Sequence, residues 1–114
     1  MTTPPMPLSS MGSPLMALRI FEDMYRHLPA PCVSISTVYP NLLELSFYED
    51  ADGFETWCQA LGIPLRKVAH SVHADGRTSV MKAVTDYSGG RVKLICFTTI
   101  PALEEARSWA EVAS

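Results

Sequence analysis

Alternating acidic residues lead into a glycine in the stretch FYEDADGFETWCQALGIP, a spacing that could supply oxygen ligands to a calcium ion. A twelve-residue calcium loop needs acidic or amide side chains at positions 1, 3 and 5, glycine at 6 and glutamate at 12. With Gly53 at position 6, Asp50 and Asp52 fill positions 3 and 5. Positions 1 and 12 then hold Tyr48 and Gln59, so the first and the bidentate ligand are missing. The sequence therefore predicts no metal site here.

The same acidic residues suit the start of a helix. Asp52 is the predicted N-cap, and Glu55 three residues later completes a capping-box-like pair. The apolar residues that follow have helical spacing: Phe54, Trp57, Cys58 and Leu61. Gly62 suits the position just past the helix, and Pro64 prevents its continuation.

Cysteine is the next residue type that could carry chemistry. Cys32, Cys58 and Cys96 are odd in number and contain no CxxC pair, which indicates reduced thiols rather than a disulfide framework or a zinc site. Cys58 and Cys96 fall on apolar faces, where a thiol is normally an inert packing group. Cys58 with His70 is the only nucleophile–base pairing that merits a test.

The histidine pair in HSVH does not predict a metal site. Its segment alternates as a strand does, so His70 and His73 point to opposite faces and cannot chelate one ion. His70 falls on the predicted core face, where we expect a hydrogen-bonded structural role. The chain contains no Walker loop and no GxGxxG, GxSxG or HExxH motif. We therefore predict no catalytic residue, no metal and no cofactor, and hence no enzyme.

Composition indicates one small domain. The 114 residues allow a single core, and 47 % hydrophobic against 18 % charged residues hints at further buried surface such as an oligomer interface. A net charge of −3 argues against general polyanion binding. We expect a cytoplasmic protein, because secretory and membrane-spanning patterns are missing and the thiols are unpaired. Residues 1–12 are predicted to be a flexible tail and residues 13–114 a single domain.

Hydrophobic periodicity predicts the element order α-β-β-α-β-β-β-α. The predicted elements are a helix from Ser13 to Leu28, a hairpin of strands 32–38 and 42–48, the helix after Asp52, three strands between residues 65 and 99, and a helix over residues 101–112. The fold class is α+β, with a mainly antiparallel sheet of about five strands. The helices should pack on one face, and the short C-terminal helix is a candidate cover for the other.

Two glycine turns predict how the last three strands align. A loop at Asp75-Gly76 places His70 opposite Met81, and a loop at Gly89-Gly90 places Asp86 opposite Lys93. Both alignments put one set of residues on the face that should carry the core: Val68, Val72, Met81, Ala83, Tyr87, Val92, Leu94 and Cys96.

The opposite face is the candidate interaction face. It combines apolar and basic side chains: Lys67, Val80, Lys82, Val84, Arg91, Lys93, Ile95 and Phe97. A face exposed only to water would not need four large apolar residues near its centre. Three covers are compatible with it: the C-terminal helix, whose Glu104, Glu105 and Glu111 would approach the lysines; a second copy of the chain; or an anionic ligand or nucleic acid.

Charge is also segregated along the chain. Residues 41–64 carry a net charge of −5, and residues 65–93 carry +4. This pattern is compatible with complementarity within one molecule, or with docking of acidic on basic surface between molecules.

Residues 42–99 run β-α-β-β-β, and their helix ends in WCQALG. This order resembles the repeated module of vicinal-oxygen-chelate proteins, whose helix ends in a similar aromatic-x-x-x-Leu-Gly pattern. That family takes His and Glu metal ligands from its strands, and the core-facing strand positions here offer no matching set. The resemblance implies a metal-free relative that pairs modules, and hence dimerisation or sequestration of a ligand.

These features predict a small non-enzymatic cytoplasmic binding module that acts through protein–protein contacts, including a homodimer through the second sheet face. The first alternative is a domain that binds or sequesters a small ligand in an apolar pocket between sheet and helices. The second is a weak nucleic-acid-associated factor that uses the basic sheet face. The net negative charge and the single aromatic residue on that face, Phe97, argue against nucleic acid as a partner.

Overall fold

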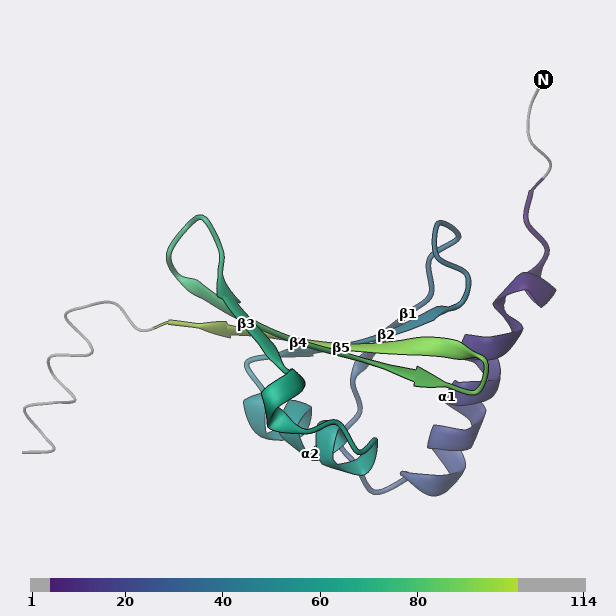
Figure 1. The fold of residues 1–114 in the computed structure, drawn as a ribbon, viewed down its shortest axis with the longest axis horizontal. Helices are drawn as coiled ribbons and strands as arrows, with labels where there is room; N and C mark the ends of the chain where they lie inside the picture. Colours follow the sequence, from purple (N-terminus) through teal and green to yellow (C-terminus); the bar gives the residue numbers. More distant parts are fainter. Residues whose placement is uncertain (1–4, 101–114) are drawn as a thin grey trace, which may run out of the picture.

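Five strands and two α-helices form the part of the chain that the computed structural model describes, residues 5–100 (Figure 1). The helices are α1 (Gly12–Met24) and α2 (Ala51–Ala60), and the 3-10 helices are η1 (Leu8–Met11) and η2 (Leu65–Lys67). The strands are β1 (Cys32–Ser34), β2 (Leu42–Tyr48), β3 (Ala69–Val72), β4 (Thr78–Tyr87) and β5 (Gly90–Thr99). The α+β class is confirmed. The predicted helix over residues 101–112 lies outside the described residues, and η1 falls within the predicted tail.

The strands lie in the order β1-β2-β5-β4-β3. Three neighbouring pairs are antiparallel as predicted, but β2 runs parallel to β5, so the sheet is mixed. Parallel neighbours cannot be joined by a tight turn. The chain leaves β2 through α2, adds β3 and β4 at the far side, and returns as β5 beside β2. From β2 to β5 the structure has the β-α-β-β-β order noted in the sequence.

Both α-helices pack on one face of the sheet, below it in Figure 1. The core joins Ala17 and Phe21 of α1 and three buried residues of α2 to six buried residues of β2 and β5. The α2 residues are Phe54, Trp57 and Cys58, and the strand residues are Leu43, Leu45, Phe47, Val92, Leu94 and Cys96. Alternate residues of both strands are therefore removed from water, which is the main driving force for folding.

Both helices begin earlier than the sequence suggested. Asp50, not Asp52, caps α2, because its Oδ1 accepts a hydrogen bond from the backbone N–H of Gly53 at 3.0 Å. Ser13 does not cap α1, which begins at Gly12. The Ser13 hydroxyl instead donates to the carbonyl oxygen of Ser88 at 3.0 Å, and so ties the first turn of α1 to the β4–β5 turn.

The predicted first hairpin is only partly present. β1 pairs antiparallel with β2, with Val33 opposite Leu45, but it ends at Ser34 rather than near residue 38. Residues 35–41 form a longer connection that closes with a hydrogen bond from the N–H of Leu42 to the carbonyl oxygen of Tyr39. β1 is therefore a short edge strand.

The β3–β4 alignment is as predicted, with His70 opposite Met81. The predicted β4–β5 alignment is wrong by two residues, because Ser88 and Gly89 form the turn and Tyr87 faces Gly90. Ser88 and Gly89 have φ of 50° and 81°, as a tight hairpin turn requires. A shift of two residues leaves every side chain on its predicted face but changes its neighbour. Arg91 rather than Lys93 therefore faces Asp86, in an exposed ion pair of 3.6 Å.

The predicted core face is correct near the helices and wrong at its far end. Ala83 is buried, and Met81, Tyr87 and Val68 pack against the core. Val72, in contrast, is exposed. The closest helix–strand packing involves β2 and β5, so β3 extends beyond the cover that the helices provide.

The β4–β5 turn yields a stability prediction. Replacing Ser88 with Asn should raise the free energy of unfolding by up to about 1 kcal/mol, because asparagine tolerates positive φ better than serine. Gly90→Ala should destabilise the fold, since its Cβ would lie 2.6 Å from the carbonyl oxygen of Asn41 and would clash with Ser13 Oγ. Thermal unfolding of both variants measures these effects. A neutral Gly90→Ala substitution would contradict the alignment.

Burial of two thiols yields a second prediction. Cys58 and Cys96 are buried and Cys32 is exposed, so a thiol reagent should modify one cysteine in the native protein and all three after unfolding. Desolvation, with the nearby charge of Glu55, raises the pKa of Cys58 from 9.0 to about 11. The protonated Cys58 thiol therefore contributes fully to the free energy of unfolding below pH 9.0. This contribution is lost as the pH rises toward 11, because the thiol loses its proton at a lower pH in the unfolded chain than in the folded one. Rapid native labelling of two thiols would contradict this packing.

Candidate functional site

Most of the predicted interaction residues lie together on the sheet face opposite the helices. We call this surface the open face: the even-numbered residues of β2 and β4 and the odd-numbered residues of β5. It holds seven of the eight predicted residues: Val80, Lys82, Val84, Arg91, Lys93, Ile95 and Phe97. The eighth, Lys67, lies in η2 before β3 begins. In Figure 1 the β1–β2 connection and the β3–β4 hairpin rise on this side of the sheet, and both α-helices lie on the other.

The apolar centre of the open face is less exposed than the sequence alone indicated. Val80 and Ile95 retain only 1 % and 5 % of their accessible surface. Val80 lies between Ser71 and Phe97 on the neighbouring strands, and Ile95 lies beside Lys82. Long side chains can cover an apolar neighbour with their stems while their polar ends stay in water. The open face therefore covers part of its own centre.

An aromatic pair remains at one end of the open face. Tyr48 of β2 stacks on Phe97 of β5 with ring centroids 5.4 Å apart and an angle of 13° between the rings. His73 approaches Phe97 edge-on at 5.9 Å. Tyr48 keeps 60 % of its surface exposed, and Val84 keeps 40 %. The sequence analysis did not find Tyr48, because only the parallel β2–β5 pairing brings it beside Phe97.

Charges of both signs surround these apolar groups. Lys82 and Arg91 are exposed and Lys93 is half-buried. Glu44 lies beside Lys93 across the β2–β5 pair, and Asp86 pairs with Arg91. The open face therefore carries charges of both signs rather than basic groups alone.

The acidic stretch after β2 has a structural role in this fold. Glu49 adopts φ of 56°, and its carboxylate accepts hydrogen bonds from the backbone N–H of Thr99, at 2.8 Å, and from the Thr99 hydroxyl. Its own N–H donates to the carbonyl oxygen of Phe97 at 2.8 Å. With Asp50 capping α2, the first two of these acids hold the β2–α2 junction against the end of β5. Within residues 5–100, no group of three His, Cys, Asp or Glu side chains is arranged to hold a metal ion.

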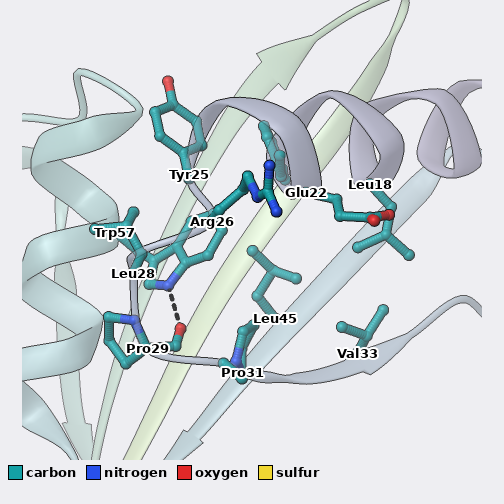
Figure 2. A pocket seen from close by; sticks show the side chains of 12 residues that line it. Leu18, Glu22, Tyr25, Arg26, Leu28, Pro29, Pro31, Val33, Leu45 and Trp57 are labelled. Carbon is teal, nitrogen blue, oxygen red and sulfur yellow. Dashed lines mark hydrogen bonds between the residues drawn. The ribbon is translucent and has the colours of Figure 1, made fainter.

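A pocket lies on the helix side of the sheet (Figure 2). This pocket, of about 420 Å³, lies between α1 and the chain of residues 29–33. Leu45 and Trp57 line its base, and Leu18 and Phe21 contribute from α1. The sequence analysis allowed for an apolar pocket but could not place it, because its width depends on how far residues 29–33 stand from α1.

The two uncharged polar side chains of the pocket wall already donate hydrogen bonds within the protein. Trp57 Nε1 donates to the carbonyl oxygen of Pro29 at 2.8 Å, as Figure 2 shows. The Tyr25 hydroxyl donates to the carbonyl oxygen of Ala60 at 3.2 Å. Both rings also pack edge to face at 5.8 Å. The charged side chains that line the pocket, Glu22 at the end of α1 and Arg26 in the turn after it, are exposed.

The cysteine–histidine pairing from the sequence is not formed. Cys58 is buried in the core, whereas His70 is exposed on β3. A ring nitrogen of His70 lies 2.6 Å from Ser79 Oγ, so the expected hydrogen-bonded role is present but at the surface. Burial also raises the pKa of the Cys96 thiol. Both core thiols are therefore held in their unreactive protonated form at neutral pH.

The helices within residues 5–100 include none that is long and apolar enough to cross a membrane. Comparison of the chain with protein-family models, with curated proteins and with solved structures found no match.

Proposed function

We propose that this protein is a non-enzymatic binding module that acts through protein–protein contacts, with its open face docking on a second copy of the chain. The observation that carries the proposal is the exposed stack of Tyr48 on Phe97, next to a sheet face that α1 and α2 leave uncovered. Exposed aromatic and aliphatic groups with a charged rim are typical of protein interfaces.

A second copy suits the charges of this face. In a two-fold interface the same patch meets itself, so it must be self-complementary. The open face carries Lys82 and Lys93 together with Glu44 and Asp86, and a two-fold rotation can bring unlike charges into register. A purely basic face would repel its own copy.

The thiols support the two remaining parts of the proposal, which are a binding role without catalysis and a cytoplasmic location. The two buried, protonated cysteines offer no activated nucleophile, which supports a binding role rather than catalysis. Three unpaired cysteines favour the cytoplasm, where thiols stay reduced.

The proposal predicts a concentration-dependent dimer that Val84→Asp weakens. Val84 is partly exposed in the monomer, so the substitution should leave the fold intact. In the dimer the new carboxylate would lose its water even though Lys93 lies opposite it on β5, and the dissociation constant should rise at least about tenfold. Sedimentation equilibrium over a range of protein concentrations measures this change.

Met24→Asp is the matched control, because Met24 is an exposed apolar residue of α1 on the helix side of the sheet. It should leave dimerisation unchanged. A wild-type protein that remains monomeric at all concentrations would refute the proposal, as would equal weakening by both substitutions. Salt-sensitive nucleic-acid binding that Lys82→Glu abolishes would instead support the nucleic-acid alternative.

A further inference from the structure

The pocket beside α1 has the size and surface of a small-molecule site. Its volume of about 420 Å³ lies within the range of roughly 300–1,000 Å³ that is typical of ligand pockets. Leu18, Phe21, Leu45 and Trp57 give it apolar walls, and residues 29–33 form the facing side. It lies on the helix side of the sheet, so it does not depend on the open face.

The two uncharged side chains of the wall that could donate a hydrogen bond already donate it within the protein. The Trp57 indole N–H is bound to the carbonyl oxygen of Pro29, and the Tyr25 hydroxyl donates to the carbonyl oxygen of Ala60. A ligand hydroxyl or amide inserted against Trp57 and Leu45 would lose its water without gaining a hydrogen bond from either side chain. The inserted part of a ligand should therefore be apolar.

The rim, in contrast, offers one charge of each sign. Glu22, in the last turn of α1, and Arg26, two residues beyond the end of that helix, both line the pocket. Figure 2 shows both side chains along the α1 edge of the pocket. In the described part of the chain, neither side chain takes part in an ion pair. A ligand head with one negative and one positive group can bridge them.

We propose that this pocket binds a large apolar α-amino acid in its zwitterionic form. The side chain fills the apolar space above Leu45 and Trp57. The carboxylate accepts hydrogen bonds from the Arg26 guanidinium, whose planar fork suits a carboxylate. The ammonium group donates to the Glu22 carboxylate.

L-Phenylalanine is the probe that tests this site, and Trp57 is the reporter. In the Trp109→Phe background, which leaves Trp57 as the chain's only tryptophan, phenylalanine should produce a saturable change in fluorescence. N-Acetyl-L-phenylalanine lacks the ammonium group, and L-phenylalaninamide lacks the carboxylate. Each should bind about tenfold more weakly than phenylalanine, since each loses one charge-assisted contact.

Two substitutions assign the head groups to the rim residues. Arg26→Gln should weaken phenylalanine binding about tenfold and leave the affinity for phenylalaninamide unchanged. Glu22→Gln should weaken phenylalanine binding equally and leave the affinity for N-acetylphenylalanine unchanged. Arg19→Gln and Asp23→Asn are matched controls, because they change the same charges on α1 at positions that do not line the pocket.

Filling the pocket provides a separate test of its location. Val33 lines the pocket, and Val33→Phe should abolish phenylalanine binding without a large change in the thermal unfolding temperature. Persistent binding in this folded variant would place the ligand elsewhere and overturn the proposal. Equal affinity for the three probes would overturn the zwitterionic head, and no saturation up to about 10 mM phenylalanine would overturn the site itself.

Discussion

The parallel pairing of β2 with β5 is the constraint on which the rest of this structure depends. It places Leu43 beside Val92, Leu45 beside Leu94 and Phe47 beside Cys96, and these rows form the centre of the core. Parallel neighbours need a crossover, and the chain supplies α2 for that purpose. α2 then packs against these same rows of core residues. Core, helix placement and strand order are consequences of this one contact between distant segments.

The same pairing determines the character of the open face. Side chains alternate along a strand, so the residues between the core rows are brought together on the other side. Tyr48 meets Phe97 and Glu44 meets Lys93 only because β2 and β5 align as they do. The aromatic stack and the mixed charges thus come from long-range pairing, whereas the basic residues of β4 and β5 alone would suggest a surface for anions.

This dependence explains which features the sequence could predict. The faces of β4 and β5 follow from local alternation of side chains. The turn at Asp75-Gly76 correctly predicted the alignment of β3 with β4. The Gly89-Gly90 pair did not define which two residues form the β4–β5 turn, because either glycine can occupy a turn position. The choice depends on the packing of Gly90 against the Asn41 carbonyl group, which no local pattern reveals. Tyr48 on the open face and the pocket above Trp57 likewise require contacts between segments far apart in the sequence.

β2 connects the two candidate sites through its alternation. Leu45 forms part of the pocket base, while the adjacent Glu44 and Ser46 lie on the open face. A molecule in the pocket and a partner on the open face would therefore contact opposite sides of one strand without competing for the same atoms. Leu45 and Ser46 are both buried, and β2 is paired on both edges, so the strand is a rigid support for either site. The short edge strand β1 is different: Val33 lines the pocket and is exposed, so the width of the pocket depends on the least supported strand beside it.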